Sequence, residues 1–189
     1  MITEEMLAAI LPHARQEGRV SDWVGPINAA LAEFEINTSL RMAAFLAQIA
    51  HESGELRYVR EIASGKAYEG RDDLGNTQPG DGVRFKGRGL LQITGRSNYA
   101  ECGNALGLDL LAHPELLEEP FNAARSAGWF WRRHHLNGLA DAGDFAKITR
   151  KINGGLRGQA LREIYYDRAL RVLTPPVGEL GLDPQGRQS

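Results

Sequence analysis

Residues 39–61, SLRMAAFLAQIAHESGELRYVRE, join an apolar helical pattern to a polar segment with several carboxyl groups. Small and apolar residues recur in the first part at helical spacing, and they cover almost every side of the helix: Leu40, Ala43, Ala44, Phe45, Leu46, Ala47, Ile49 and Ala50. Thr38 or Ser39 can cap the start of this helix, and Gly54 can end it. The pattern therefore predicts a buried helix that begins near residue 38 and ends before residue 54.

This helix places Glu52 in its last turn, where unsatisfied carbonyl groups produce a negative field and apolar neighbours are expected. Both effects favour a protonated carboxyl group. A carboxyl group that stays protonated near neutral pH can act as a general acid, and an ionised carboxylate across a cleft would complete an acid–base pair. The alternative is an ordinary solvated glutamate, and spacing by itself does not decide between the two.

Length and charge limit the classes of protein. With 189 residues and a formal net charge of −2, the chain is predicted to form one domain over residues 1–173. Residues 174–189, TPPVGELGLDPQGRQS, are rich in proline and glycine and are predicted to be a flexible tail. The slightly acidic charge and the absence of a basic stripe disfavour a nucleic-acid-binding protein.

The single cysteine excludes a disulfide framework. Cys102 is interpreted as a small packed residue on a helix, with a thiol nucleophile as the alternative. The N-terminal stretch carries acidic residues where a secretion signal has basic ones, and no segment is apolar over the length that a bilayer requires. We therefore expect a product made in the cytosol without a signal peptide and without membrane insertion.

Further helical patterns cover much of the chain, and the predicted ranges are 3–16 (capped by Thr3), 26–35 (with Pro26 in the first turn), 96–106, 114–119, 120–135 (with Phe121 facing inward), 145–152 and 159–173. Residues 53–82 show no period, and a polar loop of this length in a domain is usually functional. Glycines punctuate residues 81–99, which predicts a small hairpin or extended arm. The fold class is therefore mainly α.

Several patterns favour an ordinary structural role. The KGRG run at 86–89 lacks the surroundings of a nucleotide fingerprint. The basic run formed by Arg84, Lys86 and Arg88 is taken by default as a solvated face. Trp129, Phe130 and Trp131 are predicted to lie in the core, although an exposed one could stack on a sugar ring. HES at 51–53 lacks the second histidine of a zinc protease, so we expect no metal and no cofactor.

Three separated motifs carry a family resemblance: AQIAHESGEL (47–56), FKGRGLLQITGRSNY (85–99) and INGGLRGQALREIYY (152–166). Together, and in this order, they resemble family 19 glycoside hydrolases, the group of plant chitinases and of many bacteriophage endolysins. The resemblance covers roughly residues 45–172. It implies a lysozyme-like, two-lobed helical fold with a cleft, and inverting hydrolysis of β-1,4 bonds between N-acetylated sugars.

The resemblance also implies roles for individual residues. Glu52 matches the general acid, Glu61 best fits the second carboxylate, and Thr94 matches a hydroxyl residue that holds the attacking water. Substrate contacts are expected from the residues Tyr68, Gln92, Asn98, Asn153 and Arg162, and the arginine would also favour ionised Glu61 through its charge. Rival carboxylates in the same polar segment are Glu55, Glu69, Asp73 and Asp81; Glu55 is interpreted as a solvated rim charge, and Glu69 as a partner of Arg71 or Arg84.

An inverting mechanism needs room for water, so its two carboxyl groups should lie roughly 6.5–9.5 Å apart. The expected substrate is peptidoglycan, cut between N-acetylmuramic acid and N-acetylglucosamine by a monomeric endolysin that reaches the periplasm and cell wall with the help of a separate holin-type protein. Chitin is the alternative substrate, and a non-catalytic wall-binding module is a third reading. A lytic transglycosylase would instead leave anhydro products.

Overall fold

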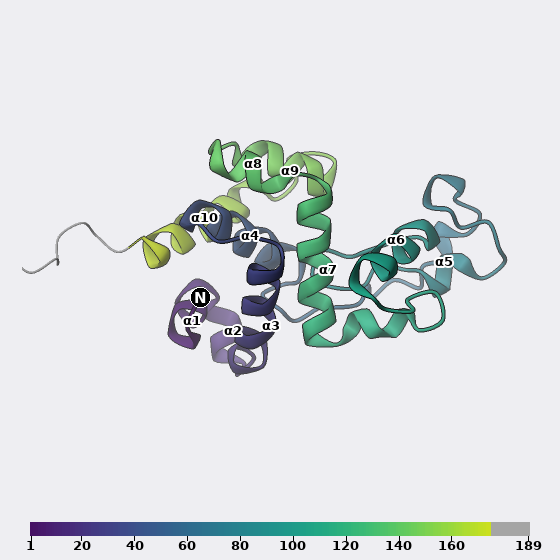
Figure 1. Ribbon diagram of the computed structural model, residues 1–189, viewed down its shortest axis with the longest axis horizontal. Helices are drawn as coiled ribbons and strands as arrows, with labels where there is room; N and C mark the ends of the chain where they lie inside the picture. Colours follow the sequence, from purple (N-terminus) through teal and green to yellow (C-terminus); the bar gives the residue numbers. More distant parts are fainter. Residues whose placement is uncertain (175–189) are drawn as a thin grey trace, which may run out of the picture.

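The computed structural model describes residues 1–174, and in this range the chain is mainly helical (Figure 1). The α-helices are α1 (Glu4–Ile10), α2 (Pro12–Gln16), α3 (Val20–Glu33), α4 (Ser39–Glu52), α5 (Asp81–Arg84), α6 (Arg96–Leu106), α7 (Pro120–Arg133), α8 (Leu136–Asp141), α9 (Phe145–Asn153) and α10 (Gln159–Leu173). Short 3₁₀ helices are η1 (Lys66–Tyr68), η2 (Asp72–Leu74) and η3 (Pro114–Glu118). The mainly helical fold class is confirmed.

The helices form two lobes on either side of α7, as Figure 1 shows. One lobe holds α1 to α4 and α8 to α10, in which α4 packs against α10 and α3 packs against α7. The other lobe holds α5, α6 and the loops around them. After α4 the chain first contacts α2 and α10 through Glu55, and it then reaches the segment that follows α5 through Glu61, which pairs with Gly87.

The buried helix predicted around residues 39–53 is confirmed as α4. Every residue from 43 to 50 is buried, and the Thr38 side chain accepts a hydrogen bond from the backbone N–H of Arg41 at 3.2 Å. Phe45 packs edge-on against Trp131 of α7 with 5.3 Å between ring centroids. Trp131 is fully buried and Trp129 nearly so, which confirms both as core residues. This packing fixes the end of α4, where Glu52 lies.

Two predictions at the N-terminus are wrong. The single helix over 3–16 is divided into α1 and α2, because Leu11 precedes Pro12 and adopts a non-helical conformation with φ −116° and ψ 77°. The helix expected to start at Pro26 instead begins at Val20 and carries Pro26 inside it. Its apolar face, with Trp23 and Ile27, is buried on both sides of the proline, and this burial outweighs the lost backbone hydrogen bond.

The region around α7 also differs from expectation. Phe121 is 56% exposed and does not face inward. The helix ends at Arg133, and a separate helix, α8, follows His135, which adopts a left-handed φ of 55°. A hydrogen bond holds α8 against α7: the side chain of Asn137, in α8, accepts from the indole N–H of Trp131 at 2.9 Å. A contact of this kind gives no periodic signal in the sequence.

The expected hairpin over 81–99 is an extended arm without regular strands in the described range. It begins with the short helix α5, and isolated bridges then join Arg88 to Arg60 and to Ile93. The tail prediction falls on residues outside the described range, apart from Thr174, and the assignment of residues 1–173 to one domain stays a prediction. No helix within residues 1–174 is long and apolar enough to cross a membrane.

Candidate active site

Glu52 lies at the last position of α4 with 23% of its side chain exposed. The guanidinium of Arg162, from α10, donates one hydrogen bond to Glu52 Oε1 and another to Gln48 Oε1. Gln48 in turn donates to Thr149 Oγ1 of α9 at 2.9 Å. The apolar wall expected around Glu52 is therefore wrong, because three helices hold its carboxyl group through a polar network.

The structure also corrects the expectation for Arg162. Its side chain is 1% exposed, and the carboxylate that it contacts is Glu52 and not the expected Glu61. His51 packs beside it, with its ring in close contact with the backbone at Gly158. Burial, and then the charge of Arg162, lower the pKa of the His51 imidazole, which keeps the ring neutral near neutral pH.

Glu61 is held on the extended segment by backbone and side-chain contacts. Its N–H donates to the carbonyl oxygen of Gly87 at 2.9 Å, and the N–H of Gly87 donates to Glu61 Oε2 at 3.1 Å. The Tyr68 hydroxyl donates to Glu61 Oε1 at 3.1 Å. Burial and this hydrogen bond raise the pKa of Tyr68, so the phenol remains a donor. Tyr68, expected to bind sugar, is therefore seen as a partner of Glu61.

Gly87 brings three of the predicted side chains together. A Cβ atom placed on this glycine would lie 2.7 Å from Gln92 Oε1, 3.3 Å from Glu61 Oε2 and 3.3 Å from Thr94 Oγ1. The three groups therefore surround the same point, and a hydroxyl lies beside a carboxylate there. Thr94 Oγ1 donates to the carbonyl oxygen of Gln92 at 3.0 Å, which leaves its lone pairs for a water molecule. This arrangement can hold and deprotonate water.

The two remaining amides lie in different places. Asn98 donates to the carbonyl oxygen of Thr94 at 2.8 Å, and it lines a cavity of about 280 Å³ together with Gln92, Thr94 and Trp129. Asn153 is exposed at the end of α9, one turn beyond Thr149, and it does not line this cavity. The structure thus places Asn98 beside the Glu61 group and Asn153 on the helix that supports Glu52.

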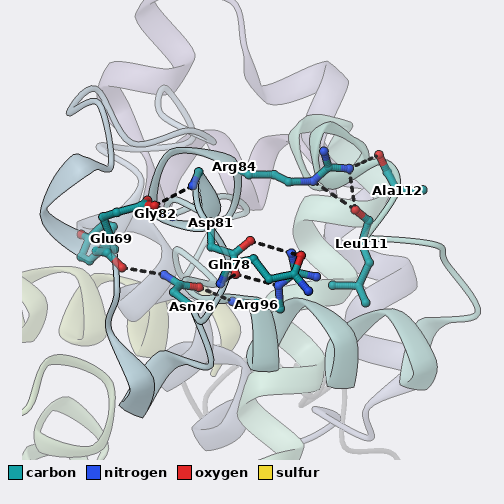
Figure 2. A network of polar contacts seen from close by, with 11 residues as sticks. Glu69, Asn76, Gln78, Asp81, Gly82, Arg84, Arg96, Leu111 and Ala112 are labelled. Carbon is teal, nitrogen blue, oxygen red and sulfur yellow. Dashed lines mark hydrogen bonds and ion pairs between the residues drawn. The ribbon is translucent and has the colours of Figure 1, made fainter.

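The rival carboxylates Glu69, Asp73 and Asp81 have structural partners, and Figure 2 shows the network around Glu69 and Asp81. Glu69 accepts hydrogen bonds from the backbone N–H groups of Gly80 at 2.5 Å and Gly82 at 2.9 Å, and not from the arginines expected. Asp81 accepts two hydrogen bonds from Arg96 at 2.6 and 2.8 Å, and this pairing lowers the pKa of Asp81. Asp73 pairs with Arg71 at 2.6 Å. Of the carboxylates considered for the role of the second acid, Glu61 is the one that lies beside Thr94.

The basic run at 84–88 is not simply a solvated face. Arg88 is 9% exposed, donates to Glu118 at 2.8 Å and contacts the Tyr99 hydroxyl at 3.0 Å. Arg84 donates to the carbonyl oxygen of Leu111 at 2.8 Å, as Figure 2 shows.

Cys102 is buried, which confirms it as a packed residue. Burial raises the pKa of its thiol to about 12, and this disfavours a role as a nucleophile.

Glu55 is not a solvated rim charge, because it is 2% exposed. Its Oε2 accepts from the backbone N–H groups of His13 at 2.7 Å and Ala14 at 3.0 Å. Its Oε1 contacts His13 Nδ1 at 2.7 Å and accepts from the Tyr165 hydroxyl at 2.8 Å. Three consecutive residues here, 54–56, have left-handed φ values of 57°, 54° and 69°. The Glu55 carboxylate thus holds an unusual turn that begins two residues after Glu52.

Tyr165→Phe should lower the free energy of unfolding by about 1.5 kcal/mol, because it removes a hydrogen bond to a buried charged group. Tyr166→Phe is the matched control: its ring stacks on Phe145 at 4.4 Å between centroids, and its hydroxyl makes no hydrogen bond within the described chain. Urea unfolding of both variants measures the difference. Equal stabilities would show that the Glu55 contact adds nothing.

The family model described as Chitinase class I, for glycoside hydrolase family 19, matches residues 31–140. This chain belongs to that family. A Haemophilus influenzae protein named a glycosyl hydrolase family 19 domain-containing protein is 31% identical over 204 residues, which cover 91% of this chain and 96% of that protein. An endochitinase of Arabidopsis thaliana is 41% identical over 115 residues, which cover 60% of this chain and 39% of the plant protein.

Solved structures agree with this assignment. A crystal structure of a bacterial family 19 chitinase superposes with a TM-score of 0.74 and 26% identity, covering 93% of this chain and 96% of the other. Chitinase C from Streptomyces griseus matches in fold, with a TM-score of 0.72, 24% identity and coverage of 91% and 76%. The protein is therefore a glycoside hydrolase with the lysozyme-like helical fold of its family.

Sequence reasoning missed two residues of the candidate site. Gln48 lies four positions before Glu52, on the same helix face, and it was a polar exception in an otherwise apolar helix. That exception was a usable signal. Gly87 gave no such signal in the sequence, because its importance comes from the three side chains that approach it in the folded chain.

Proposed function

We propose that this family 19 glycoside hydrolase degrades peptidoglycan by an inverting mechanism, in which Glu52 is the acid and Glu61 the base. The observation that carries the proposal is the grouping of the Glu61 carboxylate, the Thr94 hydroxyl and the Gln92 amide around Gly87. A water molecule bound to Glu61 and Thr94 would attack the anomeric carbon. The catalytic roles of Glu52, Glu61 and Thr94, and sugar contacts by Gln92, Asn98 and Asn153, are part of this proposal.

The bond changes balance as follows. The water oxygen bonds to the anomeric carbon while Glu61 takes a water proton. The bond from that carbon to the glycosidic oxygen breaks, and Glu52 gives its proton to the departing oxygen. Both carboxyl groups then return to their starting states through solvent. Arg162 supports this step by fixing the orientation of Glu52 through its hydrogen bond, and Gln48 holds Arg162 in place by accepting a second hydrogen bond from it.

The proposed bond lies between N-acetylmuramic acid and N-acetylglucosamine, as for a lysozyme-type endolysin that lyses a bacterial host. In this proposal the monomer is made in the host cytoplasm, and a holin-type protein gives it access to the cell wall. Chitin is the second candidate substrate, because several plant relatives are named endochitinases, including those of Arabidopsis thaliana and Zea mays.

Purified peptidoglycan and chitin oligosaccharides, each incubated with the protein, separate the candidates. We expect new reducing ends on N-acetylmuramic acid and α-anomeric products, identified by mass spectrometry and NMR. Anhydro products would identify a transglycosylase instead. Cleavage of the chitin oligosaccharides alone would contradict the peptidoglycan proposal.

A further inference from the structure

A hollow of about 410 Å³ borders Glu61 on the surface of the protein. Its lining combines three basic side chains with two carboxylates and apolar surface: Arg57, Arg60, Lys86, Glu61, Glu118, Tyr58, Val59 and Ile62. Because Glu61 also lines it, the hollow adjoins the position proposed for the catalytic base. A group that projects from a bound glycan near the cleaved bond can reach this surface.

Two of the cations have little of their charge neutralised. Lys86 Nζ donates to the backbone carbonyl oxygen of Ala63 at 3.0 Å, and within residues 1–174 no carboxylate lies within ion-pair distance of it. Arg60 is 59% exposed and stands 3.7 Å from Glu118, whose other carboxylate oxygen already accepts from Arg88 at 2.8 Å. Both side chains can therefore bind an external carboxylate without breaking a strong existing pair.

The same hollow presents apolar surface beside the charges. Ile62 is 83% exposed and Tyr58 is 43% exposed, and both are among its lining residues. Cations next to exposed apolar side chains suit a ligand that has carboxylates and small apolar groups together. A short acidic peptide has this chemistry. An unsubstituted chain of N-acetylglucosamine carries no charge for the cations to bind.

We propose that this hollow binds a carboxylate of the peptide that branches from a peptidoglycan strand. This inference rests on the proposed function, and it names what distinguishes the preferred substrate from chitin. Arg60 and Lys86 bind the carboxylate, and Ile62 and Tyr58 contact the apolar part of the peptide. The site therefore recognises the substituent and not the sugar backbone.

The test compares two forms of one substrate: peptide-bearing peptidoglycan strands, and the same strands after an amidase has removed the peptides and the lactyl carboxylates that this exposes have been converted to neutral amides. For the Arg60→Gln/Lys86→Gln double variant we expect kcat/KM on the peptide-bearing form to fall about tenfold, mainly through KM. The fall on peptide-free strands should be much smaller, so the ratio between the two substrates changes. Wild-type cleavage of the peptide-bearing form should also weaken with added salt more than cleavage of the stripped form.

Arg15→Gln is a control for the loss of a surface charge, because it removes one exposed positive charge from α2, outside this hollow, and should leave both rates unchanged. Equal losses of the double variant on both forms, or no loss, would overturn the peptide site while the proposed function stands. A wild-type protein that cleaves neither form of peptidoglycan but cleaves chitin oligosaccharides would overturn both. The two failures are thus distinct.

Discussion

Glu52→Gln should lower the rate of glycan hydrolysis by about 10³-fold or more, while the protein remains folded. Glutamine keeps the shape of the side chain and an oxygen that accepts from Arg162, but it has no acidic proton for the departing glycosidic oxygen. The measurement is the release of reducing ends from peptidoglycan, with circular dichroism and thermal unfolding of the same samples.

Two further variants make this result specific. Glu61→Gln should cause a loss of similar size, because an amide cannot take the proton of the attacking water. Glu163→Gln changes an exposed carboxylate on α10, next to Arg162, and should leave the rate unchanged. Undiminished hydrolysis by Glu52→Gln would exclude it as the acid. A wild type that binds peptidoglycan without releasing reducing ends would instead support a wall-binding module.

The helices that could be predicted from the sequence are those whose signals are local. The bounds predicted for α6 and α10 agree with the structure at both ends, since a glycine directly precedes each helix and marks its start. The cap at Thr38 was predictable for the same reason. The prediction that a helix starts at Pro26 was wrong, because α3 is buried on both sides of the proline and the neighbours that bury it are distant in the sequence.

In the candidate site, too, local features could be predicted from the sequence and long-range contacts could not. Glu52 could be placed because it ends a strongly patterned helix, and Glu61 and Thr94 through the family resemblance. The partner of Arg162 could not be predicted, because 110 positions separate it from Glu52 and only the packing of α10 on α4 brings them together. The burial of Glu55 was missed for a similar reason: its donors come from α2 and α10, far away in the sequence.

These contacts also explain how α10 positions the active-site turn. Arg162 and Tyr165 are three residues apart on α10, and they bind Glu52 and Glu55, which are three residues apart across the end of α4. Residues three apart lie on the same face of a helix, so one face of α10 holds both carboxylates. Glu52 remains partly exposed to solvent, whereas Glu55 is buried and supports the turn.

Glu55→Ala should therefore lower the free energy of unfolding by about 3 kcal/mol. The change removes the acceptor of the backbone N–H groups of His13 and Ala14 and of the Tyr165 hydroxyl, and the last two of these donors are buried. Glu69→Ala is the matched control, because that carboxylate also accepts from two backbone N–H groups but belongs to an exposed residue. Urea unfolding at neutral pH should show a much smaller loss for the control.

The pH dependence of the same contact gives an independent check. Burial would raise the pKa of Glu55, but hydrogen bonds from His13, Ala14 and Tyr165 outweigh burial and lower it. A carboxyl group whose pKa is lower in the folded state stabilises the protein above its unfolded pKa, roughly 4.3, and loses this contribution as the pH falls through its folded pKa.

The stability difference between wild type and Glu55→Gln should therefore be largest near neutral pH and shrink in acid. Other paired carboxylates, such as Asp81, titrate in both proteins and cancel from the difference. A difference that stays constant from neutral pH to pH values well below 4 would show that the buried charge of Glu55 does not stabilise the turn.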